Sequence, residues 1–302
     1  MSIEITTQGN NYEVEQFTFP GGEVQVRVPE LPTALVDLPK DSLDVVHVHA
    51  KIRSSDDVMA LLLTTSILDI RVVRTIVYVL HLHYFPYARQ DRACQVGEAE
   101  SMKVFAGLIN SLGFDTVHIW DLHNEDMLRW INNVSHDNQY VFSSRLLYAA
   151  KEAYDYVVAP DKGALPKIED KLRNIDPGFR PKLIVGEKVR DPSNGQITHT
   201  AISYEGSLAG KKLLIMDDIC DGGRTFVELA KVLQKENPAQ IDLYVTHGIF
   251  SKGLQVFEGL IDNVYTTDSF YDTNNRSTEE AWLAGTIPVF VYTNGKFIEQ
   301  GV

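Results

Sequence analysis

The most chemically distinctive stretch of the chain is KLLIMDDICDGGRTFVELAKVL, residues 212–233. Two adjacent carboxylates, Asp217 and Asp218, lie at the end of an apolar run of strand length, and a glycine-containing turn follows them. The apolar positions beyond this turn recur at helical spacing and are Phe226, Leu229, Ala230 and Leu233. The pattern predicts a strand, a turn and a helix, and such a junction exposes backbone amides that have no partner within the helix.

These residue types could bind a phosphorylated sugar. Amides of the turn and of the first helical turn can surround an anion such as a phosphate monoester. The residues that would do so are Asp221, Gly222, Gly223, Arg224 and Thr225. Asp217 and Asp218 could accept hydrogen bonds from sugar hydroxyls, or hold hydrated Mg²⁺, which prefers hard oxygen ligands. The alternative is an ordinary strand-to-helix turn whose acids complement the helix dipole, and this motif alone leaves both interpretations open.

Three further places combine the end of an apolar run with polar or charged residues. They are YARQDR at 87–92, DLH at 121–123 and APDKG at 159–163. In open parallel sheets, ligands bind beyond the carboxyl ends of the strands, so these segments are candidate site loops. His123 and Asp161 stand out as potential ligands, although either residue alone could equally cap the helix that follows it.

The elements that must position these residues alternate along the chain. Short β-branched runs at 44–50, 75–85, 115–122 and 154–160 are followed by amphipathic stretches at 56–70, 98–113, 124–131 and 162–173. This alternation predicts an α/β fold in which mostly parallel sheets are flanked by helices. The polar span at 132–144 is the best candidate boundary, which predicts two domains, residues 1–142 and 143–302.

Composition limits the classes of function. A chain of 302 residues with 44% hydrophobic and 23% charged residues is typical of a globular protein, and two domains fit its length. The beginning of the chain lacks a signal-like segment and no apolar run is long enough to cross a membrane, so a cytoplasmic protein is expected. A net charge of -13 disfavours nucleic acids and anionic membranes as partners. Local Lys and Arg residues can still bind a phosphorylated small molecule.

The acidic stretch resembles the phosphoribosyl diphosphate (PRPP) binding loop of type I phosphoribosyltransferases, whose two acids contact ribose hydroxyls and whose turn binds the 5-phosphate. Other segments occur in the order seen in the ribose-phosphate pyrophosphokinase (PRPP synthetase) family. They are YFPYARQDR at 84–92, DLH at 121–123, VVAPDKGA at 157–164, EKVR at 187–190 and VTHGIFSKG at 245–253. FPGGEVQVRV at 19–28 resembles that family's adenine-binding segment. The resemblance covers about residues 17–270 and implies two phosphoribosyltransferase-like domains.

The resemblance implies transfer of the diphosphoryl group of Mg-ATP to O1 of ribose 5-phosphate, which gives PRPP and AMP. It further implies that His123 and Asp161 bind Mg²⁺, and that Lys188 and Arg190 stabilise the transition state. Asn194-Gly195 follows these two cations between runs that can pair, which predicts a β-hairpin or closing flap. The alternative is a solvated hairpin with ordinary surface charge.

The resemblance also implies a nucleotide site. Arg89, Gln90 and Asp91 correspond to the family's ATP-binding segment, and the planar guanidinium of Arg89 suits a phosphate. Phe19 would stack on adenine and Glu23 would read its edge, both contributed by a neighbouring subunit. The implied protein is therefore a homo-oligomer, a dimer or dimers assembled into a hexamer. A location of Phe19 in the core is the alternative.

The chain departs from the family pattern at several positions. Gly21 stands where an acid is usual, Gly222 replaces the usual Thr, and Arg224 replaces a small residue. Gln95 and Gly97 occupy positions where arginines are usual, and in many members those arginines serve phosphate activation and ADP inhibition. We expect that regulation to be weak or absent here.

Two other functions stay open from the sequence. One is a non-catalytic PRPP-synthetase-associated regulatory subunit, although such a protein would be expected to lose flap cations or metal ligands. The other is a phosphoribosyltransferase that consumes PRPP, for which one domain would normally suffice.

Two histidine pairs, His47 with His49 and His81 with His83, have the i, i+2 spacing that places both side chains on one face of a strand. A zinc site is conceivable. Neither pair has a Cys or carboxylate at familiar zinc spacing, which favours polar structural or subunit-contact roles. Cys94 and Cys220 are expected to be free thiols.

Overall fold

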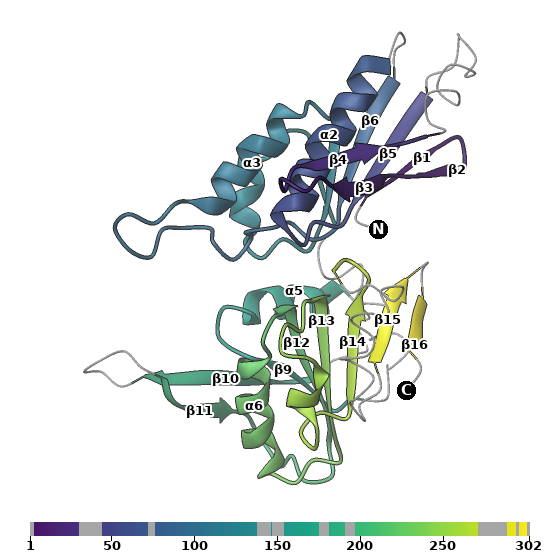
Figure 1. Cartoon of the computed structure of the whole chain (residues 1–302). Helices are drawn as coiled ribbons and strands as arrows, with labels where there is room; N and C mark the ends of the chain where they lie inside the picture. Colours follow the sequence, from purple (N-terminus) through teal and green to yellow (C-terminus); the bar gives the residue numbers. More distant parts are fainter. Residues whose placement is uncertain are drawn as a thin grey trace. The chain divides into compact units, whose positions relative to one another are not determined.

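The computed structural model describes residues 3–29, 44–71, 76–137, 146, 154–174, 181–190, 197–270, 289–293 and 296–300. The chain divides into two compact units, Met1–Asn138 and Gln139–Val302, and each unit has its own hydrophobic core. Both units combine a sheet with helices (Figure 1). The expected boundary between residues 142 and 143 lies outside the described residues.

The first unit contains a six-stranded sheet in the order β2-β1-β5-β6-β7-β8. The strands are β1 (Ile3–Thr7), β2 (Asn10–Glu13), β5 (Asp44–Ala50), β6 (Ile76–Leu82), β7 (Thr116–Trp120) and β8 (Val134–Asp137). Strands β5 to β8 are parallel, and β1 and β2 are antiparallel. A separate hairpin pairs β3 (Glu15–Thr18) with β4 (Val24–Arg27).

Helices α2 (Ser55–Arg71) and α3 (Ser101–Ser111) belong to this unit. Helix α3 buries Met102, Phe105 and Ile109, because their spacing brings them to one face. Gly113, the last residue of the amphipathic stretch expected at 98–113, has a φ of +73°, a conformation that glycine adopts without steric cost.

Two details of the first unit differ from the simplest interpretation of the sequence. The amphipathic stretch at 124–131 forms a short 3-10 helix, η1 (Glu125–Trp130), and Ile131 already has an extended backbone. The polar span at 132–144, expected to separate the domains, contains β8. All four residues of β8 are half-buried, so this edge strand forms without the apolar run that marks a central strand.

The second unit contains an eight-stranded sheet in the order β11-β10-β9-β12-β13-β14-β15-β16. The strands are β9 (Tyr156–Ala159), β10 (Lys182–Arg190), β11 (Ile197–Ser203), β12 (Lys212–Cys220), β13 (Gln240–Gly248), β14 (Asn263–Thr267), β15 (Val289–Thr293) and β16 (Lys296–Gln300). In this order, the six consecutive strands β10, β9, β12, β13, β14 and β15 run parallel. Each edge strand, β11 or β16, is antiparallel to its neighbour. Helices α5 (Leu165–Asn174) and α6 (Arg224–Gln234) and the 3-10 helix η2 (Leu254–Phe257) complete the described part. The predicted α/β fold with mostly parallel sheets is confirmed.

The centre of this sheet is nearly continuously apolar. The side chains of β12 from Leu213 to Met216 are fully buried, as expected for a parallel strand covered on both faces. Helix α6 buries the four residues that its spacing predicted, Phe226, Leu229, Ala230 and Leu233. In the part of the chain that the structure describes, no helix is long and apolar enough to span a membrane.

Candidate active site

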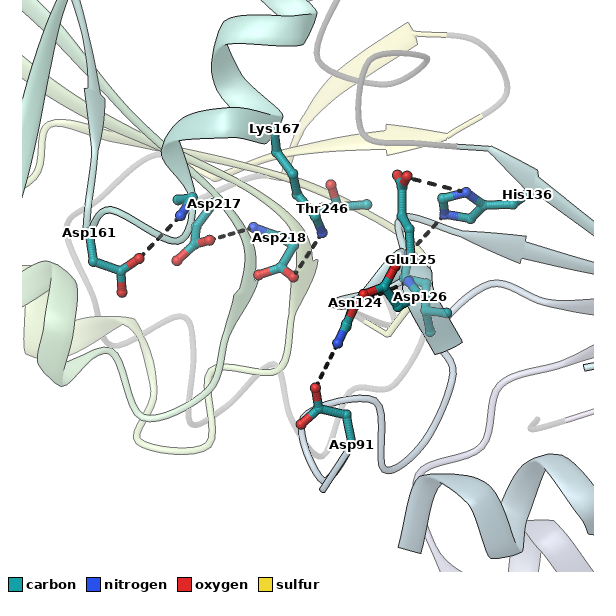
Figure 2. A network of polar contacts seen from close by, with 12 residues as sticks. Asp91, Asn124, Glu125, Asp126, His136, Asp161, Lys167, Asp217, Asp218 and Thr246 are labelled. Carbon is teal, nitrogen blue, oxygen red and sulfur yellow. Dashed lines mark hydrogen bonds and ion pairs between the residues drawn. The ribbon is translucent and has the colours of Figure 1, made fainter. Parts of the chain in front are cut away.

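An acidic cluster lies at the carboxyl edge of the second sheet. Strands β9 and β12 are parallel neighbours that pair Val158 with Ile215, so residues three positions further along each strand emerge at the same edge. Those residues are Asp161 and Asp218. Asp218 is only 6% exposed, and its amide donates a hydrogen bond to Oδ1 of Asp217 at 2.9 Å. The three acids appear together in Figure 2.

The surroundings of Asp217 disfavour its charged form. Burial raises the pKa of this carboxyl well above its ordinary value, and the neighbouring charge of Asp218 and that of Asp161 add to the effect. Nζ of Lys167 on α5 lies 3.5 Å from Oδ2 of Asp218 and partly compensates the cluster (Figure 2). Sequence reasoning missed Lys167, whose signal is its place in the first turn of the helix that follows Asp161.

Asp161 caps the start of its helix. Its Oδ1 accepts hydrogen bonds from the amides of Gly163, at 2.9 Å, and Ala164, at 3.2 Å. The capping role left open by the sequence is therefore realised.

The turn after β12 has the geometry that the sequence predicted. Gly223 is the N-cap of α6 with a φ of +74°, and no side chain caps this helix. A Cβ on Gly223 would lie 2.8 Å from Cζ of Phe257, so the turn packs closely against η2. Oδ1 of Asp221 accepts a hydrogen bond from Oγ of Ser251, in the VTHGIFSKG segment. The first amides of α6 lack a carbonyl within the helix, as anion binding requires.

The rest of the turn is accessible to different degrees. Arg224 is exposed, whereas Gly222 and Thr225 are half-buried. A Cβ on Gly222 would meet Cγ of Lys252 at 3.4 Å, which is ordinary van der Waals contact. The turn therefore lies close to the side chain of Lys252 in the neighbouring loop.

The predicted hairpin forms from β10 and β11, which pair antiparallel with an irregularity between Val189 and Arg190. The hairpin extends away from the remainder of its sheet (Figure 1). Nζ of Lys162, next to Asp161, lies 2.9 Å from Oε1 of Glu187 on β10. This ion pair joins the hairpin to the loop that carries Asp161. The side chains of Lys188 and Arg190 and the Asn194-Gly195 turn lie outside the described residues.

In the first unit, two candidate segments contact each other. Phe85 and Ala88 are buried and anchor the loop at 84–92, whereas Arg89 and Gln90 are exposed. Oδ2 of Asp91 accepts a hydrogen bond from Nδ2 of Asn124 at 2.8 Å (Figure 2). The predicted nucleotide segment is therefore tied to the loop that carries His123.

The His123 loop is held by strand β8. The amide of Leu122 donates to Nε2 of His136 at 3.0 Å, and the amide of Asp121 donates to the carbonyl of Asp137 at 2.6 Å. Asp121 is buried and has a φ of +38°, which is unusual for a residue with a side chain. His123 itself is exposed. The supporting residues Asn124 and His136 were missed; Asn124 had a signal as the cap of η1, where its Oδ1 accepts from the amide of Asp126.

Phe19 and Glu23 lie in the turn between β3 and β4. The amide of Phe19 donates to the carbonyl of Glu23 at 2.8 Å, and both side chains are exposed. The ring of Phe19 is 49% exposed and contacts Phe17 edge-on, with centroids 5.4 Å apart. The alternative that placed Phe19 in the core is therefore wrong.

The candidate residues thus form two groups, one in each unit. The first unit carries the nucleotide segment, the His123 loop and the exposed Phe19 turn. The second unit carries the acidic cluster, the helix start at Gly223 and the hairpin.

The chain is similar to known proteins in sequence. Residues 138–269 match the phosphoribosyl transferase domain family. The ribose-phosphate pyrophosphokinase of Mycoplasmopsis pulmonis is 30% identical over 220 residues, which are 72% of this chain and 66% of that protein. That of Rhizobium meliloti is 30% identical over 227 residues, 73% of this chain and 69% of that protein. The chain thus spans about two thirds of the length of these curated relatives.

The fold is also that of a solved structure. The phosphoribosylpyrophosphate synthetase of Mycobacterium smegmatis superposes with a TM-score of 0.70 at 20% identity, over 93% of this chain and 86% of that chain. This similarity extends over both units, whereas the domain match covers mainly the second. From the relatives in sequence and this shared fold, the chain belongs to the ribose-phosphate pyrophosphokinase family.

Proposed function

We propose that this protein transfers the diphosphoryl group of Mg-ATP to O1 of ribose 5-phosphate and releases PRPP and AMP. One observation carries the proposal: the half-buried Asp217 and the buried Asp218 lie near the end of β12, and the turn after this strand leads into α6, whose N-cap Gly223 provides no side-chain cap. Carboxylates suit sugar hydroxyls and free amides suit a phosphate, so this junction matches the two ends of a ribose phosphate. Membership of the pyrophosphokinase family supports the same reaction.

In this proposal the second unit binds ribose 5-phosphate. The 5-phosphate accepts hydrogen bonds from amides of Gly222 to Thr225, and Asp221 holds the turn through Ser251. Asp217 and Asp218 accept hydrogen bonds from the ribose hydroxyls. Those donors favour the ionised carboxylates and offset the burial that raises the pKa of Asp217.

The carboxylate of Asp161 is the kind of ligand that a hard divalent cation prefers. Asp161 offers carboxylate oxygens, and its charge already contributes to the raised pKa of Asp217. Asp161 in the second unit and His123 in the first unit are each proposed as Mg²⁺ ligands. Imidazole is an unusual ligand for this ion, so the role of His123 depends on the family resemblance. When bound, Mg²⁺ would neutralise charge on the ATP phosphates.

The first unit binds ATP in this proposal. Arg89 offers its planar donor fork to a phosphate, Gln90 lies beside it, and Asp91 is fixed by Asn124. Phe19 and Glu23 contact the adenine bound to a neighbouring subunit. An exposed aromatic ring on a hairpin turn supports such a contact, since it is available to a ligand or a partner. The protein would then act as a homo-oligomer.

The chemical step requires little covalent participation by the protein. O1 of ribose 5-phosphate attacks the β-phosphorus in line, and the bond from this phosphorus to the oxygen bridging it to the α-phosphate breaks as AMP leaves. Lys188 and Arg190, carried by the hairpin, neutralise the diphosphoryl group during transfer. A hairpin that closes only over both substrates would exclude water and limit ATP hydrolysis.

The test is AMP release from ATP and Mg²⁺ by the purified chain, with and without ribose 5-phosphate. We expect AMP and PRPP only when the sugar phosphate is present, and loss of both products when Asp217 and Asp218 are replaced together by Asn. Binding of ribose 5-phosphate without AMP formation would favour a regulatory subunit. Consumption of added PRPP with a nucleobase would favour a phosphoribosyltransferase.

A further inference from the structure

Five histidines lie on one face of the first sheet. His47 and His49 are on β5, His81 is on β6, His83 follows β6 directly, and His118 is on β7. The parallel register places His49 opposite His81, and His81 opposite His118. The residues at the intervening positions, among them Val48, Leu80, Leu82 and Val117, are buried on the other face. Strand alternation combined with this register brings the five imidazoles together.

Three of these side chains converge closely. One ring nitrogen from each of His49, His81 and His83 lies within 4.8 Å of those of the other two, and all three residues are half-buried. The rings of His49 and His81 stack with centroids 4.3 Å apart. Ligand nitrogens around a tetrahedral zinc ion are about 3.3 Å apart, given Zn–N bonds of about 2.0–2.1 Å. Bringing each pair of nitrogens closer by at most about 1.5 Å would therefore give the spacing of zinc ligands.

Neighbouring side chains contact two of the three rings, those of His81 and His83. Nδ1 of His47 lies 2.9 Å from Nε2 of His81, so His81 can keep its Nδ1 for an ion. The ring of His83 stacks on Trp120 with centroids 3.5 Å apart and an interplanar angle of 9°. Nδ1 of His118 is buried, and among the described residues it has no hydrogen-bond partner. Partners of this kind orient metal-binding histidines and are part of the site.

We propose that His49, His81 and His83 form a transition-metal site for an ion such as Zn²⁺, distinct from the proposed Mg²⁺ site. Imidazole ligands suit zinc, copper and nickel and are disfavoured by Mg²⁺. Three protein ligands leave a fourth position of a tetrahedral ion for water or another ligand. The proposal uses none of the residues assigned to ATP or ribose 5-phosphate, so it stands or falls independently of the proposed reaction.

The experiment is a titration of the full metal-free chain with Zn²⁺ against a chromophoric chelator. The wild-type protein is expected to bind one ion tightly. His49→Gln and His83→Gln should each weaken binding by about 100-fold or more, since loss of an outer partner alone typically costs about 10- to 100-fold. His47→Gln, which removes only the partner of His81, should cost about 10-fold. His123→Ala is the matched control that removes an imidazole elsewhere, and its zinc affinity should equal that of the wild type.

Two results would overturn the proposal: absence of a tight wild-type site, or loss of zinc binding in His123→Ala with retention in His49→Gln and His83→Gln. The second result would locate the ion in the proposed nucleotide loop instead. Thermal unfolding of each variant in chelator separates loss of folding from loss of binding. The visible absorption of the wild-type Co²⁺ complex is a check that needs no variant: intense tetrahedral bands are expected, and weak octahedral bands would contradict three-imidazole coordination.

Discussion

At the scale of single residues, the ionised form of Asp217 beside Asp218 destabilises the ligand-free folded protein near neutral pH. Burial is the main cause of the raised pKa of Asp217, and the charge of Asp218 is the next. A raised pKa in the folded state means that the protonated form is favoured by folding. The contribution of the protonated carboxyl to folding stability is complete below pH 3.8, the ordinary pKa of an Asp side chain. This contribution is lost as the pH rises through the raised pKa of the folded state.

Replacing Asp217 with Asn removes this destabilising charge. Asn keeps an oxygen that can accept the hydrogen bond from the amide of Asp218. We expect Asp217→Asn to unfold at a higher temperature than the wild type near neutral pH, by about 2–4 °C for each kcal/mol gained. The difference should shrink at acid pH, and AMP formation should be lost. Calorimetry of the ligand-free proteins at both pH values checks this, and an equal or lower Tm for the variant near neutral pH would contradict it.

Lys188 acts in the transition state if the proposed reaction is correct. Lys188→Ala is then expected to lower turnover by about 10²- to 10³-fold, as removal of a transition-state donor does. The affinity for ribose 5-phosphate should stay nearly unchanged, because the sugar phosphate binds elsewhere. Steady-state kinetics and a binding titration separate these effects.

An equal loss of turnover and of affinity would make Lys188 a simple binding residue. Lys231→Ala is a suitable control in the same unit, because this lysine forms an exposed ion pair with Glu228 on α6. Exposed pairs of this kind contribute little, so the control should behave as the wild type does.

At the scale of elements, the candidate phosphate site depends on how α6 begins. Gly223 combines a φ of +74° with close contact to Phe257, and neither feature tolerates a side chain. The strand before it and the helix after it both have buried apolar faces. The amides that would bind the phosphate are thereby held between two rigid elements.

Gly223→Ala should therefore weaken binding of ribose 5-phosphate by about 10-fold or more and destabilise the protein by about 1–3 kcal/mol. Gly210→Ala is the matched control, since Gly210 has a φ of +70° but no atom within 4 Å of an added Cβ. The control should lose stability through backbone strain alone and keep its affinity. Isothermal titration with ribose 5-phosphate measures the contrast; equal affinities for both variants would contradict a role for this turn.

Several elements of the second unit could be predicted from the spacing of apolar and turn residues along the sequence. The apolar run of β12, the spacing of α6 and the pairing of β10 with β11 could all be derived from the sequence. Strand β8 could not, because an edge strand needs no continuous apolar run and its polar residues resemble a linker. The 3-10 geometry of η1 was missed for a similar reason, since six residues carry too little periodicity to separate one helix type from another.

Contacts between distant residues were harder to predict than the elements. The contacts of Lys167 with Asp218, and of Asn124 with Asp91, join side chains far apart in the sequence, and no spacing indicates them. The histidine pairs show the same limit. Alternation placed each pair on one face of a strand, but only the register of β5 with β6 brings the two pairs together.

At the scale of the whole molecule, the candidate residues are divided between two units with separate cores. The proposed assembly adds a third contributor, the Phe19 turn of a neighbouring subunit. A shared site predicts complementation between two defective variants. Phe19→Ala lacks the adenine contact that it would give to its neighbour, and Asp217→Asn lacks the acid of its own site.

Mixed oligomers of these two variants should recover part of the wild-type turnover. Each such oligomer contains sites that combine an intact Asp217 from one chain with an intact Phe19 from the other. Activity should rise after the variants are unfolded and refolded together, and stay low when each is treated alone. No gain on mixing, with oligomers formed as in the wild type, would mean that Phe19 serves its own subunit or no site.

In the proposed reaction, two phosphates leave ATP together. Phosphorus NMR of a reaction containing the protein, ATP, Mg²⁺ and ribose 5-phosphate tests this. We expect AMP and PRPP to appear in equal amounts and ADP not to accumulate. Formation of ADP with a singly phosphorylated sugar product, or ATP that stays unchanged, would contradict it.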